Sequence, residues 1–219
     1  MLPKAIVFDV DGVLFDTEVL LRGVWETYSA ELGWPQVGEN YLSFMGQSRA
    51  GICQKMERMF GTEFPAMDFL TRCSERAQAL MEAEGVPMKP GVRELLDYLH
   101  SVDMPLALAT STNATRTYRR MEMTGLDRDF PTIITGDLIE HSKPAPDIYL
   151  AACEKLGVDP ADAIAVEDSA NGIRSAHAAG MGAVMVPDLI PCSPDLEPLL
   201  LTCVPDLIAL RDYLKAMAD

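Results

Sequence analysis

Two aspartates, Asp9 and Asp11, come directly after the apolar run Ala5–Phe8. Side chains alternate along a strand, so both carboxylates can serve one site only if the chain leaves strand geometry after Asp9. Gly12 permits such a turn, because it tolerates backbone angles that are closed to other residues. This spacing favours a carboxylate nucleophile with an acid/base partner, a Mg²⁺ site, or both. The simpler alternative is a strand that ends in solvated aspartates.

Three more loops place polar side chains after apolar, strand-like runs. In chain order they contribute Thr110, Ser111 and Asn113, then Lys143, then Glu167 and Asp168. The carboxyl ends of parallel strands lie at one edge of a sheet, where ligands bind, so we expect these side chains to gather beside the two aspartates. Taken singly, each has a plainer explanation, since hydroxyls and carboxylates cap helices and a lone lysine is commonly solvated.

Glu167 and Asp168 are adjacent carboxylates at the end of a predicted strand. Such a pair is costly unless a cation compensates it, and Asp9 is expected nearby. Carboxylate oxygens are the ligands that Mg²⁺ prefers. The sequence therefore predicts Mg²⁺ as the cofactor.

Short runs that are apolar on both faces recur along the chain, as they do in a buried parallel sheet. They are residues 5–8, 106–109, 132–134, 163–166 and 183–186. A helical pattern at 92–101 precedes the last four runs, and helical patterns at 147–156 and 170–179 separate the last three. This alternation predicts an α/β fold with a doubly wound, Rossmann-like parallel sheet.

About ninety residues separate the first two strands, far more than one crossover needs. Helical patterns at 18–32, 48–60 and 67–84 fill this segment, and each is followed by a glycine that can end a helix. We therefore expect an all-helical cap domain, residues 17–85, inserted after the first strand. The α/β catalytic core would then consist of residues 1–16 and 86–219.

The net charge of −15 disfavours nucleic acid as a partner, because phosphate backbones are bound by Lys and Arg. No apolar stretch approaches the ~20 residues of a membrane span, and nothing resembles a signal peptide. The five cysteines are widely spaced, with no Cys-x-x-Cys pair, as in proteins whose thiols stay free in a reducing compartment. We expect a cytoplasmic monomer with no membrane partner.

Together, the motifs resemble those of the haloacid dehalogenase superfamily, in its branch of β-phosphoglucomutase-like phosphatases. Four motifs stand in the family's order: Phe8-Asp9-Val10-Asp11-Gly12, Thr110, Lys143-Pro144 and Glu167-Asp168. The helical insertion after the first motif matches the position of the family's cap. The motif set is specific for the superfamily and says little about the substrate.

The resemblance implies phosphoryl transfer through an aspartyl-phosphate. Asp9 would be the nucleophile, and Asp11 would act as general acid and then as general base. Lys143 would steady Asp9 and add positive charge. Phosphate oxygens would be held by Thr110 and the amides that follow it, in the segment that carries Ser111 and Asn113.

The resemblance also implies a ligand set for Mg²⁺. The protein ligands would be the Asp9 carboxylate, the Asp11 backbone carbonyl and Asp168. Glu167 would lie in the ligand shell or just beyond it. Arg49 matches a cap arginine that contacts the substrate in the mutases, although it could equally be a surface arginine at the start of a helix.

The expected activity is Mg²⁺-dependent hydrolysis of a small phosphorylated metabolite, a sugar or polyol phosphate. The main alternative is a sugar phosphomutase of the β-phosphoglucomutase type. Those mutases carry a histidine early in the first cap helix, whereas residues 17–22 contain none, which favours hydrolysis. Dehalogenation is disfavoured because the dehalogenases lack the second aspartate. A catalytically silent binding module on the same fold is a distant alternative, because every motif residue needed for chemistry is present.

Overall fold

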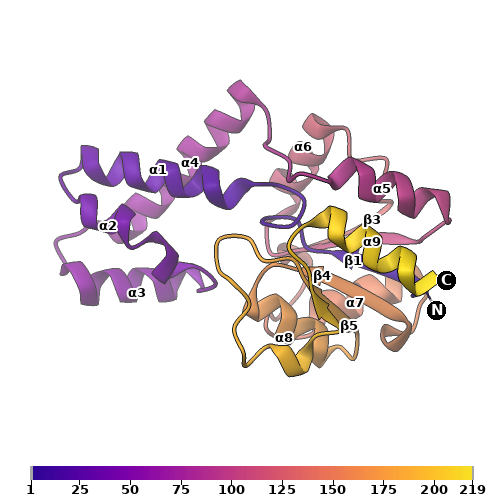
Figure 1. Cartoon of the computed structure of the whole chain (residues 1–219). Coiled ribbons are helices and arrows are strands. Elements are labelled where there is room, and N and C mark those ends of the chain that lie inside the picture. The colour runs from indigo at the N-terminus through magenta and orange to yellow at the C-terminus, as the bar shows by residue number, and fades with distance from the viewer. Residues whose placement is uncertain (1, 219) are drawn as a thin grey trace. The chain divides into compact units, whose positions relative to one another are not determined.

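The computed structural model describes residues 2–218 and divides the chain into two compact units (Figure 1). The first unit runs up to Asp16 and resumes at Met88, and the second is Thr17–Pro87. The predicted insertion, residues 17–85, falls inside the second unit. Among the described residues, all strands belong to the first unit. No helix in residues 2–218 has the length and apolar character that crossing a membrane requires.

Within residues 2–218, the strands form one parallel sheet in the order β3-β2-β1-β4-β5-β6. The strands are β1 (Ala5–Phe8), β2 (Leu106–Thr110), β3 (Thr132–Thr135), β4 (Ala163–Glu167), β5 (Gly182–Met185) and β6 (Thr202–Cys203). The central strands β1, β2 and β4 are buried along their whole length, as expected of parallel strands covered on both faces. Successive strands are added first on one side of β1 and then on the other. Such a reversal opens a crevice at the carboxyl ends of the neighbouring strands.

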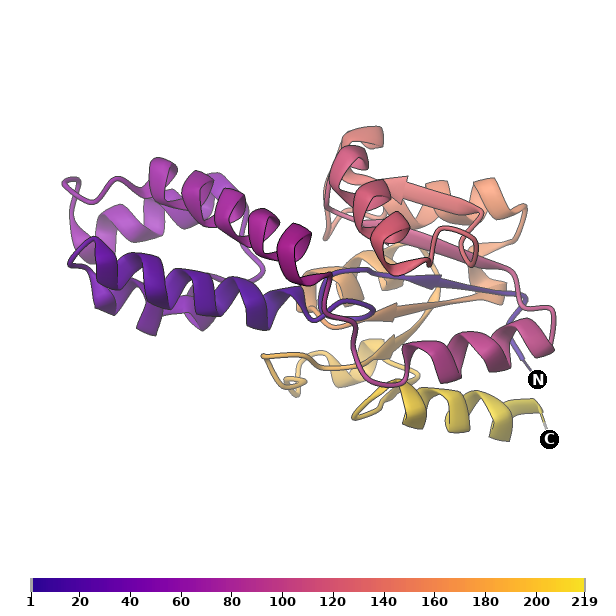
Figure 2. The same ribbon diagram turned by 90° about the horizontal axis from the view of Figure 1, so that it is seen from above.

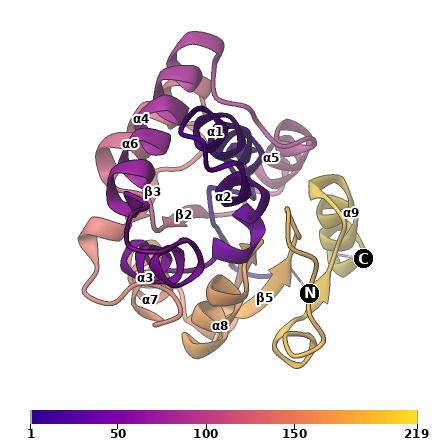
Figure 3. The same cartoon turned by 90° about the vertical axis from the view of Figure 1, so that its left-hand side faces the viewer.

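Helices cover both faces of this sheet. They are α5 (Val92–Ser101), α6 (Ala114–Thr124), α7 (Asp147–Leu156), α8 (Ala170–Ala178) and α9 (Leu207–Ala218), with 3₁₀ turns at η2 (Gly136–Leu138), η3 (Pro160–Asp162) and η4 (Glu197–Leu199). Helices α7 and α8 lie next to each other on one face (Figures 1 and 3), and α5 and α9 pack together on the opposite face (Figure 2). The predicted doubly wound α/β fold with a helical insertion after the first strand is confirmed.

Among the described helices and strands, four have no counterpart among the predicted ranges, namely β6, α6, α9 and, in the second unit, α2 (Pro35–Glu39). Strand β6 has only two residues and lies at the sheet edge, so it is too short to show a strand period. Helix α2 has five residues, including a proline and a glycine. The other strands end within one residue of their predicted bounds.

The second unit is built around a cluster of aromatic rings. Its elements are α1 (Thr17–Glu31), α2, the 3₁₀ turn η1 (Tyr41–Phe44), α3 (Arg49–Phe60) and α4 (Ala66–Glu84). The buried ring of Trp25 on α1 meets Tyr41 at 5.0 Å and Phe69 at 5.1 Å between ring centroids, both edge to face. This geometry is the favoured one for aromatic pairs.

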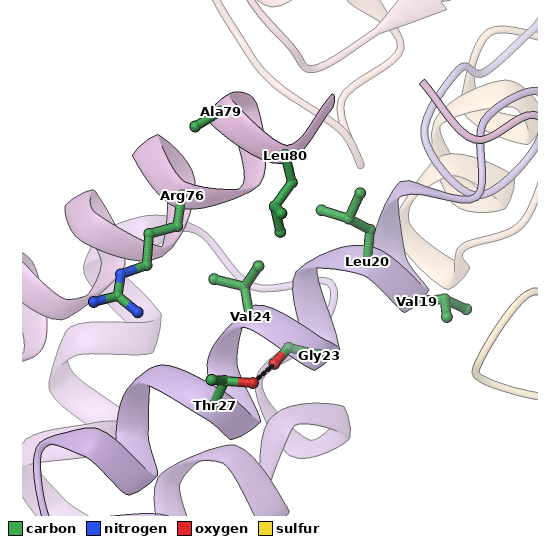
Figure 4. A pocket seen from close by; sticks show the side chains of 8 residues that line it. All are labelled: Val19, Leu20, Gly23, Val24, Thr27, Arg76, Ala79 and Leu80. Carbon is green, nitrogen blue, oxygen red and sulfur yellow. Dashed lines mark hydrogen bonds between the residues drawn. The ribbon is translucent and has the colours of Figure 1, made fainter. Parts of the chain in front are cut away.

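A groove of about 700 Å³ lies between α1 and α4 of this unit (Figure 4). Its lining is mostly apolar and includes Leu20, Val24 and Leu80. Arg76 also lines the groove, but it forms an ion pair with Glu31 at 2.7 Å and lies over the Tyr28 ring at 4.1 Å. These contacts account for Arg76 as a structural residue.

Helix α2 approaches α1 so closely that only glycine fits at position 38. A Cβ atom there would lie 2.5 Å from the Cα atom of Glu26. The amide of Gly38 also donates to Oγ of Ser29 at 3.1 Å. The close packing of these two helices therefore requires a residue without a side chain at position 38.

We predict that Gly38→Ala destabilises the protein by about 1–3 kcal/mol, because backbone atoms must move apart to admit the methyl group. Gly23→Ala is the matched control, since a Cβ atom at Gly23 meets nothing within 4 Å. In the middle of α1, that change should instead stabilise by about 0.5–1 kcal/mol. Urea denaturation of the two variants measures both effects, and shifts of the same sign would contradict the prediction.

Candidate active site

Asp9 lies at the carboxyl end of β1. This is the strand at which the order of the sheet changes sides, with β2 on one side and β4 on the other. Its amide donates to the carbonyl of Val166 on β4 at 2.9 Å, which extends the strand pairing and fixes where the side chain points. The buried carboxylate accepts a hydrogen bond from Nζ of Lys143 at 2.5 Å. Burial raises the pKa of Asp9 to about 7, while the charge of Lys143 acts in the opposite direction. Lys143 is therefore what favours the charged form of this buried group.

Lys143 reaches from the loop before α7 and distributes its three ammonium protons among three acceptors. These are Oδ1 of Asp9 at 2.5 Å, Oε1 of Glu167 at 2.6 Å and the carbonyl of Ala109 at 2.9 Å. The ring of Tyr149 lies 5.0 Å from Nζ, within the range of a cation–π contact. Burial alone would lower the pKa of Lys143, but the two carboxylates outweigh it and raise the pKa above its ordinary value. Lys143 is thus a fixed cation at the carboxyl ends of the central strands.

Glu167 ends β4 and is completely buried. Its Oε1 accepts from Lys143 and from the hydroxyl of Tyr149 at 2.7 Å, and its Oε2 accepts from the amides of Asp168 and Ser169 and from Oγ of Ser169. A Cβ atom at Gly172 would lie 1.8 Å from the Glu167 carboxyl carbon. The carboxylate is therefore held from all sides, and Gly172 makes the room for it.

Asp9, Glu167 and Asp168 form a cluster that could hold a metal ion. Each offers one carboxylate oxygen, and the three atoms lie within 4.8 Å of one another. Gly12 adopts φ 85° and lies against Asp168, so a Cβ atom there would meet Oδ2 of Asp168 at 2.4 Å. This cluster of oxygen donors fits a hard divalent cation.

Asp11 turns away from the strand, and both of its carboxylate oxygens accept hydrogen bonds. Oδ1 accepts from the guanidinium of Arg120 on α6 at 2.5 Å, and Oδ2 accepts from Oγ1 of Thr112 at 2.7 Å. Neither partner was singled out from the sequence. The available signal is that Arg120 shares the buried stripe of α6 with Thr117 and Met121, an unusual place for an arginine.

Thr110 is the last residue of β2 and lies at the same carboxyl edge of the sheet. Thr110 is buried, and its Oγ1 accepts from the amide of Thr112 at 3.1 Å. Asn113 caps α6 by accepting from the amide of Arg116. The carbonyl of Ser111 packs against Gly136, where a Cβ atom would be 2.4 Å away. Phosphate binding by this loop stays a prediction.

Arg49 belongs to the second unit, at the start of α3. Its guanidinium donates to Oγ1 of Thr71 at 2.5 Å and to the carbonyl of Met67 at 3.3 Å, both on α4. The preceding residue, Ser48, caps α3 through the amide of Gly51. Arg49 therefore ties two helices of its own unit together, and its predicted contact with substrate stays a prediction.

We predict that Asp9→Asn stabilises the metal-free protein above pH 7. The folded-state pKa of Asp9, about 7, lies above its ordinary value of 3.8, so the folded protein loses stability from this group as pH rises through that window. Asparagine removes the loss, and Lys143 keeps Glu167 as a partner. A gain on the order of 1 kcal/mol would raise Tm by about 2–4 °C.

The Tm difference between variant and wild type, measured with chelator present, should be small near pH 4.5 and largest above pH 7. Asp97→Asn, on the exposed face of α5, is the matched control and should show no such trend. A difference that is constant across this range would contradict the assignment of the stability loss to the Asp9 charge.

Comparison with known proteins places this site in a family. A family model described as haloacid dehalogenase-like hydrolase matches residues 6–186. A protein named phosphorylated carbohydrates phosphatase, from Thermotoga maritima, is 33% identical over 179 residues, which cover 81% of this chain and 82% of that protein.

Two solved structures share the fold over almost the whole chain. A HAD family hydrolase from Deinococcus radiodurans, with bound phosphate and sodium, has a TM-score of 0.81 at 27% identity and covers 98% of this chain and 96% of its own. A mutant of CbbY from Rhodobacter sphaeroides, in complex with xylulose-(1,5)-bisphosphate, has a TM-score of 0.74 at 28% identity and covers 94% of this chain and 95% of its own. The chain therefore belongs to the haloacid dehalogenase-like hydrolase family, and its similarity to named phosphatases confirms the predicted phosphoric monoester hydrolase.

Proposed function

We propose that this protein is a Mg²⁺-dependent phosphatase that hydrolyses a sugar or polyol phosphate through an aspartyl-phosphate on Asp9. The observation that carries the proposal is the buried Asp9 carboxylate, held by Lys143 beside Glu167 and Asp168. A carboxylate that water does not solvate and one lysine orients is suited to nucleophilic attack. The substrate class is supported by the phosphorylated carbohydrates phosphatase and by the sugar bisphosphate bound to CbbY.

The charges of the site support a divalent cation. Among the described residues, the site brings four carboxylates together with two cations. The carboxylates are Asp9, Asp11, Glu167 and Asp168, and the cations are Lys143 and Arg120. A phosphate monoester would add further negative charge. We propose that Mg²⁺ is held by the carboxylates of Asp9 and Asp168 and the backbone carbonyl of Asp11, with Glu167 just outside. When bound, the ion would offset the repulsion between the nucleophile and the phosphate.

The proposed chemistry divides between the two aspartates. Asp9 attacks phosphorus, and the bond to the leaving oxygen breaks as the new bond forms. Asp11 gives its proton to that leaving oxygen. The Asp11 carboxylate then takes a proton from the water that attacks the aspartyl-phosphate, which frees phosphate and restores Asp9. General acid–base catalysis of this kind contributes about 10²–10⁴-fold to rate.

Other residues at the carboxyl ends of the strands would bind the phosphate. Thr110, with the amides of the segment that carries Ser111 and Asn113, would donate hydrogen bonds to phosphate oxygens. Lys143 lies against Asp9 and would add positive charge there. Hydrogen-bond donors that are oriented before the reaction need no reorganisation during it. Such electrostatic preorganisation is usually the largest contribution to catalysis.

We further propose that the helical unit is a cap that selects the substrate. Every motif residue lies in the first unit, while the second contains a small pocket whose mostly apolar lining includes the polar side chains of Glu18, Tyr41 and Gln47. The Tyr41 hydroxyl donates to Glu18 at 2.5 Å, which orients an acceptor suited to sugar hydroxyls. We propose Arg49, whose Nη2 donates to Thr71, as a cap residue that contacts the substrate.

We predict that chelation with EDTA abolishes phosphate release from sugar and polyol phosphates, and that Mg²⁺ restores it. Beryllium fluoride should form its adduct on Asp9, and Asp9→Asn should release no phosphate although it folds. A colorimetric phosphate assay and mass spectrometry of the trapped protein make these measurements. Full activity in chelated buffer, or an adduct on another residue, would contradict the proposal.

We predict hydrolysis rather than isomerisation of sugar phosphates. Residues 17–22 lack the histidine that the resembling mutases carry, so nothing from that position holds water away from the aspartyl-phosphate. The protein is incubated with β-glucose 1-phosphate and a catalytic amount of β-glucose 1,6-bisphosphate, while glucose 6-phosphate and free phosphate are followed together. Fast formation of glucose 6-phosphate with little free phosphate would establish the mutase instead.

A further inference from the structure

Arg120 links the middle of α6 to the carboxylate of Asp11. Its guanidinium donates to Oδ1 of Asp11 at 2.5 Å, and Thr112 donates to Oδ2 at 2.7 Å. The Arg120 side chain is 11% exposed and that of Asp11 is 22% exposed. The two donors come from different elements, the helix α6 and the loop after β2. Together they hold both oxygens and leave the carboxylate little freedom to rotate.

The fold alone gives no reason for an arginine at this position. Removing a guanidinium from water is unfavourable, and replacing a buried ion pair with apolar side chains of similar volume often leaves a protein as stable or more so. Nε of Arg120 is buried and has no hydrogen-bond partner among the residues described. The cost of burial is therefore not offset by a complete set of bonds. The strong contact that Arg120 does make is with Asp11.

We propose that Arg120 is a positioning residue for Asp11, which together with Thr112 fixes the carboxylate that transfers the proton. The inference rests on the proposed function, because it takes Asp11 as the acid and base. Asp11 loses its proton to the leaving oxygen as the bond from phosphorus to that oxygen breaks. The charge that then appears on Asp11 falls on an oxygen already bonded to a guanidinium, a charge-assisted pairing. An acid held in one orientation also avoids the loss of rate that misplacement causes.

The test is the dependence of kcat/KM on the leaving group in a series of aryl phosphates, from p-nitrophenyl phosphate to phenyl phosphate. A good leaving group needs no proton, whereas a poor one does. In Arg120→Met, kcat/KM should fall by about 10- to 100-fold for phenyl phosphate, a part of what a general acid supplies, and little for p-nitrophenyl phosphate. The plot of log kcat/KM against leaving-group pKa should thus be steeper than in wild type. Arg120→Lys should restore part of the wild-type slope.

Arg119→Met is the matched control. Arg119 is the neighbouring, exposed arginine on α6 and pairs with Glu122, so its loss should leave the slope unchanged. If Arg120→Met does not fold, as judged by circular dichroism, Thr112→Val is the alternative variant. It removes the hydrogen bond to the other carboxylate oxygen of Asp11 and should also steepen the slope.

Asp11→Asn separates the two hypotheses. If it steepens the slope and the Arg120 variants lose activity equally with every aryl phosphate, the inference is wrong and the proposed function stands. If Asp11→Asn leaves the slope at the wild-type value, Asp11 is not the acid, and the inference falls with that assignment.

Discussion

The site depends on one costly arrangement, the removal of the Asp9 carboxylate from water. Desolvation opposes the charge of a buried acid, so the fold must supply a counter-charge that does not move. Lys143 supplies it, and Lys143 can be buried in turn only because Glu167 and the carbonyl of Ala109 accept its other two protons. Lys143 thus compensates the burial of both carboxylates, Asp9 and Glu167.

The sheet makes this arrangement possible through its register. Phe8 pairs with Val166 on β4 and with Leu108 on β2, so the ends of three adjacent strands are nearly level. The residues that directly follow those strands therefore lie close to one another. Two glycines then clear the space, because a Cβ atom at Gly12 or Gly172 would lie within 2.4 Å of an Asp168 or Glu167 carboxylate. The strand register brings the carboxylates together, and the two glycines leave the space that these carboxylates occupy.

The sequence predicts the parts of the site that follow from strand ends. Asp9, Lys143, Glu167 and Asp168 are expected together because the carboxyl ends of parallel strands share an edge. In the structure Lys143 donates to Asp9 and to Glu167, and a carboxylate oxygen of Asp168 lies within 4.8 Å of one on each of these two acids. Arg120 and Thr112 were not expected. Their bonds to Asp11 span 109 and 101 residues. The bond of Arg120 depends on the rotation of α6 about its axis, and that of Thr112 depends on the path of the loop after β2, neither of which a local sequence pattern specifies. Tyr149 was likewise not singled out from the sequence, although its hydroxyl donates to Glu167.

Asp9 and Asp11 are the same side chain two residues apart, and their surroundings make them chemically different. Asp9 is buried and shares Lys143 with Glu167, so its geometry is set by a network. Asp11 is more open to solvent and lies between a hydroxyl and a guanidinium that serve it directly. Two carboxylates with distinct environments can take distinct roles in one reaction. The separation follows from Gly12, since its left-handed backbone lets the chain turn after Asp11 and present the second aspartate to α6 while the first stays at the end of β1.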